Sequence, residues 1–234
     1  MIVRDGLTFI LVGLVVTILL ASGAIRWSSL SLLIAAAVFA LLTLFTAFFF
    51  RNPPRTIPTD PRVLVSPADG RIVAIKSLED HPHIGAPAKR VSIFLSVLDV
   101  HLNRTPAAGV IDYVRYNPGK FFAAFEEKAS ELNEQTEIGM TTTGGHKIVF
   151  TQIAGLIARR IVCNLETGQE VAKGERFGLI RFGSRTDLIV PAQWEIAVSL
   201  GDHVAGGETV IGYLPSTTDA AGEDERGVED RAVE

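Results

Sequence analysis

The chain has 234 residues, a net charge of −4 and 47% hydrophobic residues, enough for one packed domain and a membrane anchor. A slightly acidic chain lacks the basic footprint of a nucleic-acid-binding protein, so no nucleic-acid partner is expected. The single cysteine excludes an internal disulfide and a cysteine pair at zinc-ligand spacing.

Residues 1–50 are predicted to form a membrane anchor. Two uncharged apolar stretches, Leu7–Ala21 and Leu30–Phe50, are separated by a turn that contains Gly, Ser and Trp27. Because about 20 apolar residues cross a bilayer, we expect a hairpin of two transmembrane helices. A cleaved signal peptide is the alternative, although the second stretch would still anchor the chain.

Residues 51–62 read as a proline-rich linker, since prolines stop a helix and favour extended chain. Arg51 and Arg55 follow the second apolar stretch, whereas Arg26 lies in the turn before it. The positive-inside rule therefore favours a domain on the cytoplasmic side of the plasma or inner membrane, with Arg26 as a weaker opposing signal.

Residues 63–215 are predicted to form a β-rich domain, all-β or α+β, because short apolar runs alternate with Gly, Pro and Asp. Only residues 122–134 have the composition of a helix. The acidic segment 216–234 has few apolar residues and is expected to be a disordered tail. The expected strands cover residues 63–65, 71–75, 91–97, 110–116, 147–153, 157–164, 177–182, 188–190 and 194–198.

An eight-residue pattern, G-x-x-V-A-x-G-E, occurs at 168–175 and again at 201–208, each time before an apolar strand. Its glycines supply turn positions where a side chain would clash. The pattern recurs in small β-sandwiches of the biotinyl or lipoyl carrier kind. Neither Lys173 nor Lys147 has the flanking methionines of a carrier lysine, so the repeat predicts a carrier-like β-sandwich element rather than a carrier function.

Four polar blocks contain the candidate site residues, and each block alone has an ordinary structural interpretation. Asp69 lies in a turn before a strand, and a lone histidine at a strand end is usually structural. A Gly-Ser pair after a strand is usually a turn. The blocks are Ser66–Ile72 with Asp69, Asp99–Pro106 with His101 and Arg104, Asn117–Glu134 with Lys120 and Phe121, and Arg181–Arg185 with Gly183 and Ser184.

Together and in this order, the four blocks resemble the phosphatidylserine decarboxylase proenzymes, from about residue 48 to residue 215. The chain looks closest to the short-chain form, which is cut at a Gly-Ser-Arg or Gly-Ser-Thr junction. The resemblance implies conversion of phosphatidylserine to phosphatidylethanolamine in phospholipid biosynthesis, with the phospholipid and the membrane as partners.

The resemblance also implies a cofactor that the chain makes from itself. Ser184 Oγ attacks the Gly183 carbonyl, an N→O acyl shift gives an ester, and β-elimination frees the upstream chain. Hydrolysis of the remaining dehydroalanine leaves a pyruvoyl group and ammonia. The products are a β chain, 1–183, and an α chain, 184–234, which are expected to stay paired as a heterodimer. Further oligomerisation is left open, and no metal is implied.

The base for this maturation has three candidate assignments. Larger family members use an Asp, a His and the Ser, within S-P-x-D-G and H-x-x-H-x-P motifs. Here Asp69 and His101 match, but Arg104 stands at the second histidine. Either His101 acts with Asp69, which we favour, or Asp69 acts without a histidine, or the short form works differently.

Substrate contacts are expected from two pairs of residues. Arg104 and Arg185 suit a head-group phosphate or carboxylate, because the guanidinium fork matches both. A surface salt bridge is the alternative for each arginine. Lys120 and Phe121 are expected to face the lipid, with core packing as the alternative for this segment.

Three other functions stay open on the sequence. A pyruvoyl decarboxylase of a soluble amino acid is disfavoured by the anchor, because a soluble substrate gives no reason for membrane attachment. A zinc peptidase would take its ligands from His81, His83, Asp69 and His101. An inactive scaffold would keep the Gly183–Ser184 bond intact.

Overall fold

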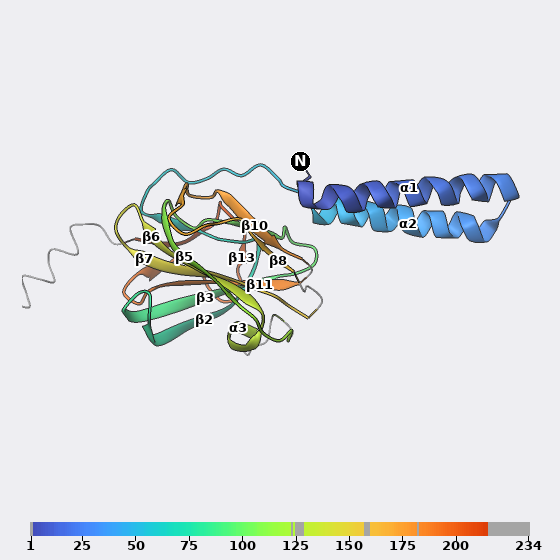
Figure 1. Ribbon diagram of the computed structural model, residues 1–234. Helices are drawn as coiled ribbons and strands as arrows, with labels where there is room; N and C mark the ends of the chain where they lie inside the picture. Colours follow the sequence, from blue (N-terminus) through green and yellow to red (C-terminus); the bar gives the residue numbers. More distant parts are fainter. Residues whose placement is uncertain (1, 123, 125–128, 157–159, 182, 215–234) are drawn as a thin grey trace, which may run out of the picture. The chain divides into compact units, whose positions relative to one another are not determined.

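The computed structural model describes residues 2–122, 124, 129–156, 160–181 and 183–214 (Figure 1). The chain divides into two compact units. The first contains Met1–Pro54 together with Val97–His101, and the second contains Arg55–Ser96 together with Leu102 onward. The predicted linker 51–62 is therefore shared between the two units, and the predicted tail 216–234 lies outside the described residues.

The first unit is a hairpin of two helices, α1 (Arg4–Trp27) and α2 (Leu30–Phe49), which confirms the predicted helical hairpin. Ser28 makes the turn with a left-handed backbone, and the Ser29 side chain caps α2 by accepting a hydrogen bond from Leu32 N. The helices approach closely where Gly13 faces Thr43, since a Cβ on Gly13 would lie 2.3 Å from Thr43 Oγ1.

The outer surfaces of both helices are apolar and exposed. Their mean hydropathies are 2.5 and 2.6, while only 6% and 17% of the most apolar segments are buried by protein. Both helices are long enough to cross a bilayer, and exposed aliphatic side chains of this number fit a lipid environment. The two helices therefore associate the chain with a membrane.

The second unit consists of antiparallel strands in one eight-stranded sheet and two three-stranded sheets, seen as curled layers in Figure 1. Their orders are β13-β2-β3-β11-β7-β6-β5-β9, β1-β14-β12 and β4-β10-β8. The strands are β1 (Val63–Val65), β2 (Gly70–His81), β3 (Ala86–Leu95), β4 (Leu102–Arg104), β5 (Gly109–Asn117), β6 (Gln135–Thr142), β7 (Lys147–Ile153), β8 (Ile161–Cys163), β9 (Glu170–Val171), β10 (Arg176–Ile180), β11 (Ser184–Pro191), β12 (Glu195–Ile196), β13 (His203–Val204) and β14 (Val210–Tyr213).

The strand pairings reveal two halves with the same architecture. We call β4–β10 the inserted half, and β1–β3 together with β11–β14 the split half. β13 pairs with the start of β2 as β9 pairs with the start of β5, so Val204 lies opposite Gly70 and Val171 opposite Gly109. The two three-stranded sheets correspond as well, β1-β14-β12 to β4-β10-β8.

Backbone hydrogen bonds repeat the same correspondence. Gly207 N donates to Ser66 O at 2.8 Å, and Gly174 N donates to Thr105 O at 2.8 Å. These contacts place the two G-x-x-V-A-x-G-E copies at equivalent turns, one in each half. The sequence repeat is therefore the visible part of an internal two-fold relation that covers the whole β domain.

The inserted half lies in the chain between β3 and β11 of the split half. In the inserted half, the corresponding strands β6 and β7 are joined by a tight turn that includes Gly145, at φ +79°. On β11, Thr186 pairs with Ile93, and at the equivalent place on β7, Ile148 pairs with Met140. Counting back along the two strands from Thr186 and Ile148, Ser184 corresponds to His146 and Gly183 to Gly145. Gly183, at φ +66°, is thus the last residue before the chain re-enters the split half.

A large apolar core joins the two halves, with fully buried residues from both, including Leu64, Ile72, Ile111, Phe150 and Leu188. The predicted β-rich fold class is confirmed. Several elements differ from their predicted limits, and three of these differences bear on the site.

The described part of 122–134 contains only the short helix α3 (Ala129–Leu132). β6 was not expected, because its sequence of Gln, Thr, Glu and Gly lacks an apolar run. β11 begins at Ser184 rather than at residue 188, because four polar residues at its start are buried and paired with neighbouring strands.

Candidate active site

Ser184 is the first residue of the central strand β11, between β3 and β7. It pairs with Leu95 on β3, and its side chain is 0% exposed. Among the described residues, Ser184 Oγ has no hydrogen-bond partner. A buried hydroxyl without a partner is uncommon and costly, and a catalytic role is one reason for such a group.

The residue before Ser184 has open space on its Cα side and close packing at its carbonyl oxygen. A Cβ added to Gly183 would meet no atom within 4 Å. On the other side, a Cβ added to Gly155 would lie 1.9 Å from Gly183 O, so the carbonyl occupies the space that a side chain at Gly155 would take. Gly155 was not predicted from the sequence, because its closeness to Gly183 depends on the pairing of β7 with β11.

Asp69 accepts hydrogen bonds from a side chain and from the backbone in the second unit. Arg55 Nη2 donates to its oxygens at 2.8 and 2.6 Å, and Gly206 N donates to Oδ1 at 2.8 Å. Glu208 accepts from Arg55 Nη1 at 2.9 Å and from Thr56 N at 2.6 Å. Since Ser184 Oγ has no partner in the described part of the chain, Asp69 is not hydrogen bonded to it.

The charges of this cluster shift the pKa values of its members. Burial lowers the pKa of Arg55, but the hydrogen bond to Glu208 and the charge of Asp69 outweigh it, so the pKa is raised. The pKa of Glu208 is lowered, first by the hydrogen bond from Thr56 N and then by Arg55. Arg55 therefore ties the segment that follows the anchor to Asp69, a role not predicted from the sequence.

Arg104 lies between the two repeated turns. Its Nη1 donates to Gly174 O at 2.9 Å, and a Cβ on Gly207 would lie 2.8 Å from its Cδ. Burial, followed by the charge of Arg55, lowers the pKa of Arg104, although Asp69 and Glu208 act against this. The structure therefore brings Arg104 and Asp69 into one charged cluster.

His101 belongs to the first unit, with the segment 97–101. Its Nδ1 lies 3.0 Å from Asp99 O, which fixes the proton on Nδ1 and the lone pair on Nε2. Its ring packs on Phe49 at 4.3 Å between centroids. Burial lowers the pKa of His101 to about 4, so the imidazole is neutral at neutral pH.

Arg185 lies on the other face of β11 and is 1% exposed. Its Nε donates to Asp187 Oδ1 at 2.7 Å, and its Nη2 donates to Ser92 Oγ. Ser130 in α3 donates to Asp187 Oδ2 at 2.7 Å. In this structure the guanidinium thus takes part in a buried ion pair, and its predicted contact with substrate stays a prediction.

Three buried polar side chains form a hydrogen-bonded group on the side of the large sheet that Ser184 faces. Asn103 Nδ2 donates to Thr186 Oγ1 at 3.1 Å, and Gln152 Nε2 donates to Asn103 Oδ1 at 2.9 Å. All three are 0% exposed. No local signal in the sequence indicates this group, because the three residues come from β4, β7 and β11.

Lys120 and Phe121 lie in the connection between β5 and β6. Lys120 is exposed and bridges to Asn133, and Phe121 is half-buried. Asn133 fixes this connection by donating to Phe122 O at 2.9 Å and to Ala154 O at 2.7 Å. The described contacts leave the predicted lipid-facing role of Lys120 and Phe121 untested.

Nothing in the described part of the chain favours the zinc alternative. No group of three or more His, Cys, Asp or Glu side chains is close enough there to hold a metal ion. His83 Nε2 instead lies 3.1 Å from Asp112 Oδ2, and His81 Nδ1 accepts from His83 N.

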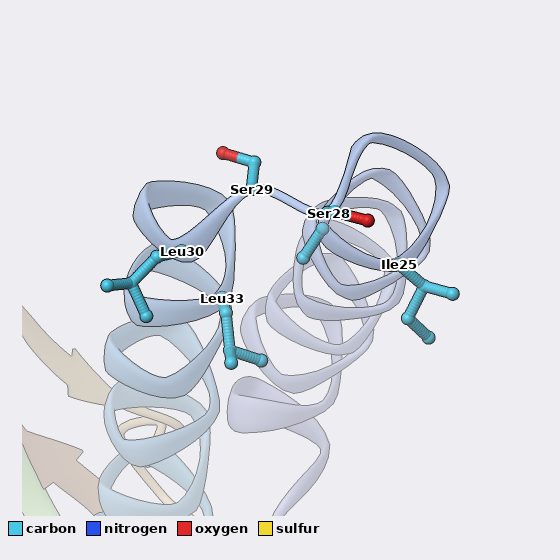
Figure 2. Close-up of a pocket in the computed structure, with 6 residues that line it drawn as sticks. Ile25, Ser28, Ser29, Leu30 and Leu33 are labelled. Atoms are coloured by element: carbon cyan, nitrogen blue, oxygen red, sulfur yellow. The ribbon is translucent and has the colours of Figure 1, made fainter.

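A hollow of about 300 Å³ lies at the turn of the helical hairpin, where Ile25, Leu30 and Leu33 line it beside Ser28 and Ser29 (Figure 2). It contains no ionisable side chain, so it offers no acid, base or charged ligand for chemistry.

Known proteins resemble this chain over most of its length. The family model described as phosphatidylserine decarboxylase matches residues 42–212. The chain is 45% identical to the phosphatidylserine decarboxylase proenzyme of Symbiobacterium thermophilum, over 92% of this chain and 96% of that protein. It is 45% identical to the proenzyme of Desulfotalea psychrophila, over 90% and 95% of the two chains. The chain belongs to the phosphatidylserine decarboxylase family.

Proposed function

We propose that this protein decarboxylates phosphatidylserine to phosphatidylethanolamine, with a pyruvoyl group that it makes from Ser184 by cutting its own chain after Gly183. One observation carries the proposal: within a chain of this family, Ser184 Oγ is buried and has no partner in the described part of the protein. The site fits the group, because a small planar pyruvoyl is no larger than the serine residue from which it forms.

The residues around the junction support the cut in three ways. Gly183 has no Cβ to block attack on its carbonyl, and its left-handed backbone suits glycine alone. Gly155 leaves space for the carbonyl oxygen. The Ser184 hydroxyl has no competing hydrogen bond among the described residues, which leaves its lone pairs available for attack.

The atoms of the maturation balance with water as the only added reactant. Ser184 Oγ bonds to the Gly183 carbonyl carbon as the C–N bond breaks, which gives an ester and a free amine. Loss of the residue-184 α-proton and of the Cβ–Oγ bond releases the β chain as a carboxylate. Water then replaces the resulting enamine nitrogen, which leaves as ammonia.

The strand pairing supports retention of the α chain after the proposed cut. β11 pairs with β3 on one side and with β7 on the other, and all eight of its residues are buried. β12, β13 and β14 follow in the same fragment and pair with β14, β2 and β1. The proposed α chain is thus built into both kinds of sheet and stays bound as a heterodimer.

When present, the pyruvoyl group supplies a ketone that condenses with the substrate amine and accepts the electron pair left by CO2. His101 is proposed as the base in maturation, since its neutral ring carries a lone pair on Nε2. Asp69 is proposed to act with it. Arg104 and Arg185 are proposed to bind the head group, and Lys120 and Phe121 to contact the lipid.

The hairpin is proposed to hold the domain on the cytoplasmic side of the membrane, where Arg51 and Arg55 follow the second helix. A phospholipid substrate gives a reason for this attachment, because it stays in the bilayer. A soluble amino acid as substrate would not need the hairpin.

Intact mass spectrometry tests the proposal on three full-length chains purified in detergent. The wild type is expected to give two chains, the smaller beginning with pyruvoyl, and to release CO2 from phosphatidylserine vesicles. Ser184→Ala is expected to stay one chain and release none. His146→Ala, at the corresponding position of the inserted half, is expected to behave as the wild type. A folded wild type that stays one chain contradicts the proposal.

A further inference from the structure

The polar group formed by Asn103, Gln152 and Thr186 has an apolar counterpart in the other half of the domain. By the strand correspondence, Asn103 matches Leu64, Thr186 matches Ile148 and Gln152 matches Val190. These three counterparts are 0% exposed and belong to the apolar core. The same backbone therefore packs without polar side chains at these positions, so the fold does not require them.

The polar group also contains an unpartnered atom. Gln152 Nε2 donates to Asn103 Oδ1 at 2.9 Å and to Val162 O at 3.2 Å. Because a carbonyl oxygen can only accept, Val162 fixes which end of the amide faces it. Gln152 Oε1 is then a buried acceptor with no donor among the described residues.

Gln152 and Ser184 face the same side of the sheet. Arg185 pairs with Ile153 and Thr186 with Gln152, so Ser184 and Gln152 are diagonal neighbours on adjacent strands. Diagonal neighbours of an antiparallel pair lie about 7–8 Å apart, within reach of a long side chain. Two buried orphan groups, a hydroxyl at residue 184 and an acceptor on Gln152, thus occur on one small area of the sheet.

We propose that Gln152 Oε1 accepts a hydrogen bond from the amino group of the substrate, and that Asn103 and Thr186 hold Gln152 in position for it. This inference rests on the proposed function, in which the reacting amine meets residue 184. An amide oxygen accepts hydrogen bonds and donates none. It therefore suits an amino group, which in its charged ammonium form donates hydrogen bonds and accepts none. A hydrogen bond from the substrate would give the buried acceptor a partner. This also explains why these positions are polar, whereas the corresponding positions of the other half are apolar.

The experiment compares four full-length proteins in detergent: wild type, Gln152→Met, a triple variant and a control. The triple variant N103L/Q152V/T186I copies the apolar residues of the other half, which already pack in this backbone. The control is Ile148→Val. Ile148 is the counterpart of Thr186 and lies on β7, the strand that also contains Gln152. Each protein is measured for maturation by intact mass, for Tm, and for kcat/KM with phosphatidylserine. The Schiff base between the substrate amine and the α chain is also reduced chemically, and the resulting adduct is measured by mass spectrometry.

We expect the triple variant to mature and to keep or raise the Tm, because its three polar side chains are replaced together. Gln152→Met should mature with a slightly lower Tm, because the buried Asn103 Oδ1 loses its donor. The kcat/KM of both variants should fall about 10- to 100-fold, the size of a hydrogen bond to a charged group, and amine capture should slow with it. Ile148→Val should lower the Tm and keep kcat/KM and capture unchanged.

Unchanged kcat/KM and capture in Gln152→Met overturns the inference and leaves the proposed function standing. A loss of activity together with a collapse of the Tm in both polar-group variants assigns the three residues to structure alone and also overturns it. A wild type that matures but releases no CO2 from phosphatidylserine removes the proposed function, and the inference with it.

Discussion

At corresponding positions, the split half and the inserted half of the β domain place different chemistry on the same backbone. Both halves keep the glycine turns, the strand pairing and the apolar core. The shared features are those that the fold needs, and the differences include the residues at the Gly183–Ser184 junction. The split half has Asp69, Ser184 and the Arg185–Asp187 ion pair, where the inserted half has Ala108, His146, Lys147 and Val149.

The comparison also explains why the junction lies where it does. In the inserted half, β6 returns directly into β7, and Gly145 serves only a turn. In the split half the inserted half separates β3 from β11, so Gly183 is not needed to close a hairpin. The proposed cut would leave the described strands intact, because it falls between the end of β10 and the start of β11.

The largest effect is expected from Gly155→Ala, just beyond the end of β7. The new Cβ would lie 1.9 Å from Gly183 O and must displace that carbonyl. Since a displacement of about 1 Å can slow a reaction about 100-fold, self-cleavage should slow by at least that factor. The fraction of intact chain over time, followed by mass spectrometry, measures it.

Gly145→Ala is the matched control, because its Cβ would meet open space in the other half. Its left-handed backbone should cost about 1 kcal/mol of stability without slowing the cut. Equal cleavage rates for the two alanine variants would show that the space at Gly155 is irrelevant to maturation.

The next largest effect is on stability, at the Arg185–Asp187 ion pair. Both side chains are nearly fully buried, at 2% and 3% exposed. Arg185→Met leaves the buried Asp187 carboxylate with Ser130 Oγ and the longer contact to Arg90 Nε at 3.7 Å, so it should lower the free energy of unfolding by about 3 kcal/mol. The double variant R185M/D187V, which copies Val149 at the second position, should recover part of this loss in denaturant titrations, because Arg90 then loses Asp187.

The double variant also tests the predicted contact between Arg185 and the substrate. A stable double variant with an unchanged KM for phosphatidylserine would limit Arg185 to a structural role. A KM that rises while stability is restored would support head-group binding by the guanidinium.

A smaller effect is expected from Asp69→Ala, which copies Ala108 of the inserted half. Arg55 would lose a carboxylate partner, and Gly206 N would lose its acceptor. Because Arg55 keeps Glu208, we expect a loss of about 2–3 kcal/mol in unfolding free energy, together with slower maturation. Glu208→Gln, at a side chain that is 32% exposed, is the milder control. Equal losses for the two variants would contradict a special role for Asp69.

Local signals explain most of what the sequence predicts. The glycine repeat, the two apolar stretches and strands such as β1 and β7 are continuous patterns in the chain. The limits of β1 and β7 match the structure, whereas α1 extends beyond the predicted stretch at both ends. Ser184 is recognised only through the order of four short blocks. The fold class follows from the same local patterns.

The remaining features depend on which distant strands are neighbours. β6 lacks an apolar run, yet it is central in the large sheet because β5 and β7 pair with it. Gly155 matters because it faces Gly183, and Gln152 because it lies diagonally from Ser184. No periodicity or motif within a single segment carries such information.

The smallest effect is on pH dependence, and it concerns His101, in the segment where the chain leaves the split half. Its pKa is lowered by burial to about 4 from an ordinary value near 6.5. The unfolded chain therefore binds the proton more tightly, and stability is lost as pH falls from 6.5 toward 4. Between pH 7 and pH 5.5 this should remove about 1 kcal/mol of unfolding free energy.

The measurement is denaturant unfolding in detergent at both pH values, for the wild type and for His101→Gln. The pH-dependent loss should shrink by about 1 kcal/mol in the variant, because glutamine binds no proton. His146→Gln, in the turn of the inserted half, provides the same change of residue in the other half and should leave the wild-type dependence. If His101→Gln and the wild type lose stability equally, His101 is not held neutral by burial, and its assignment as a neutral base fails with it.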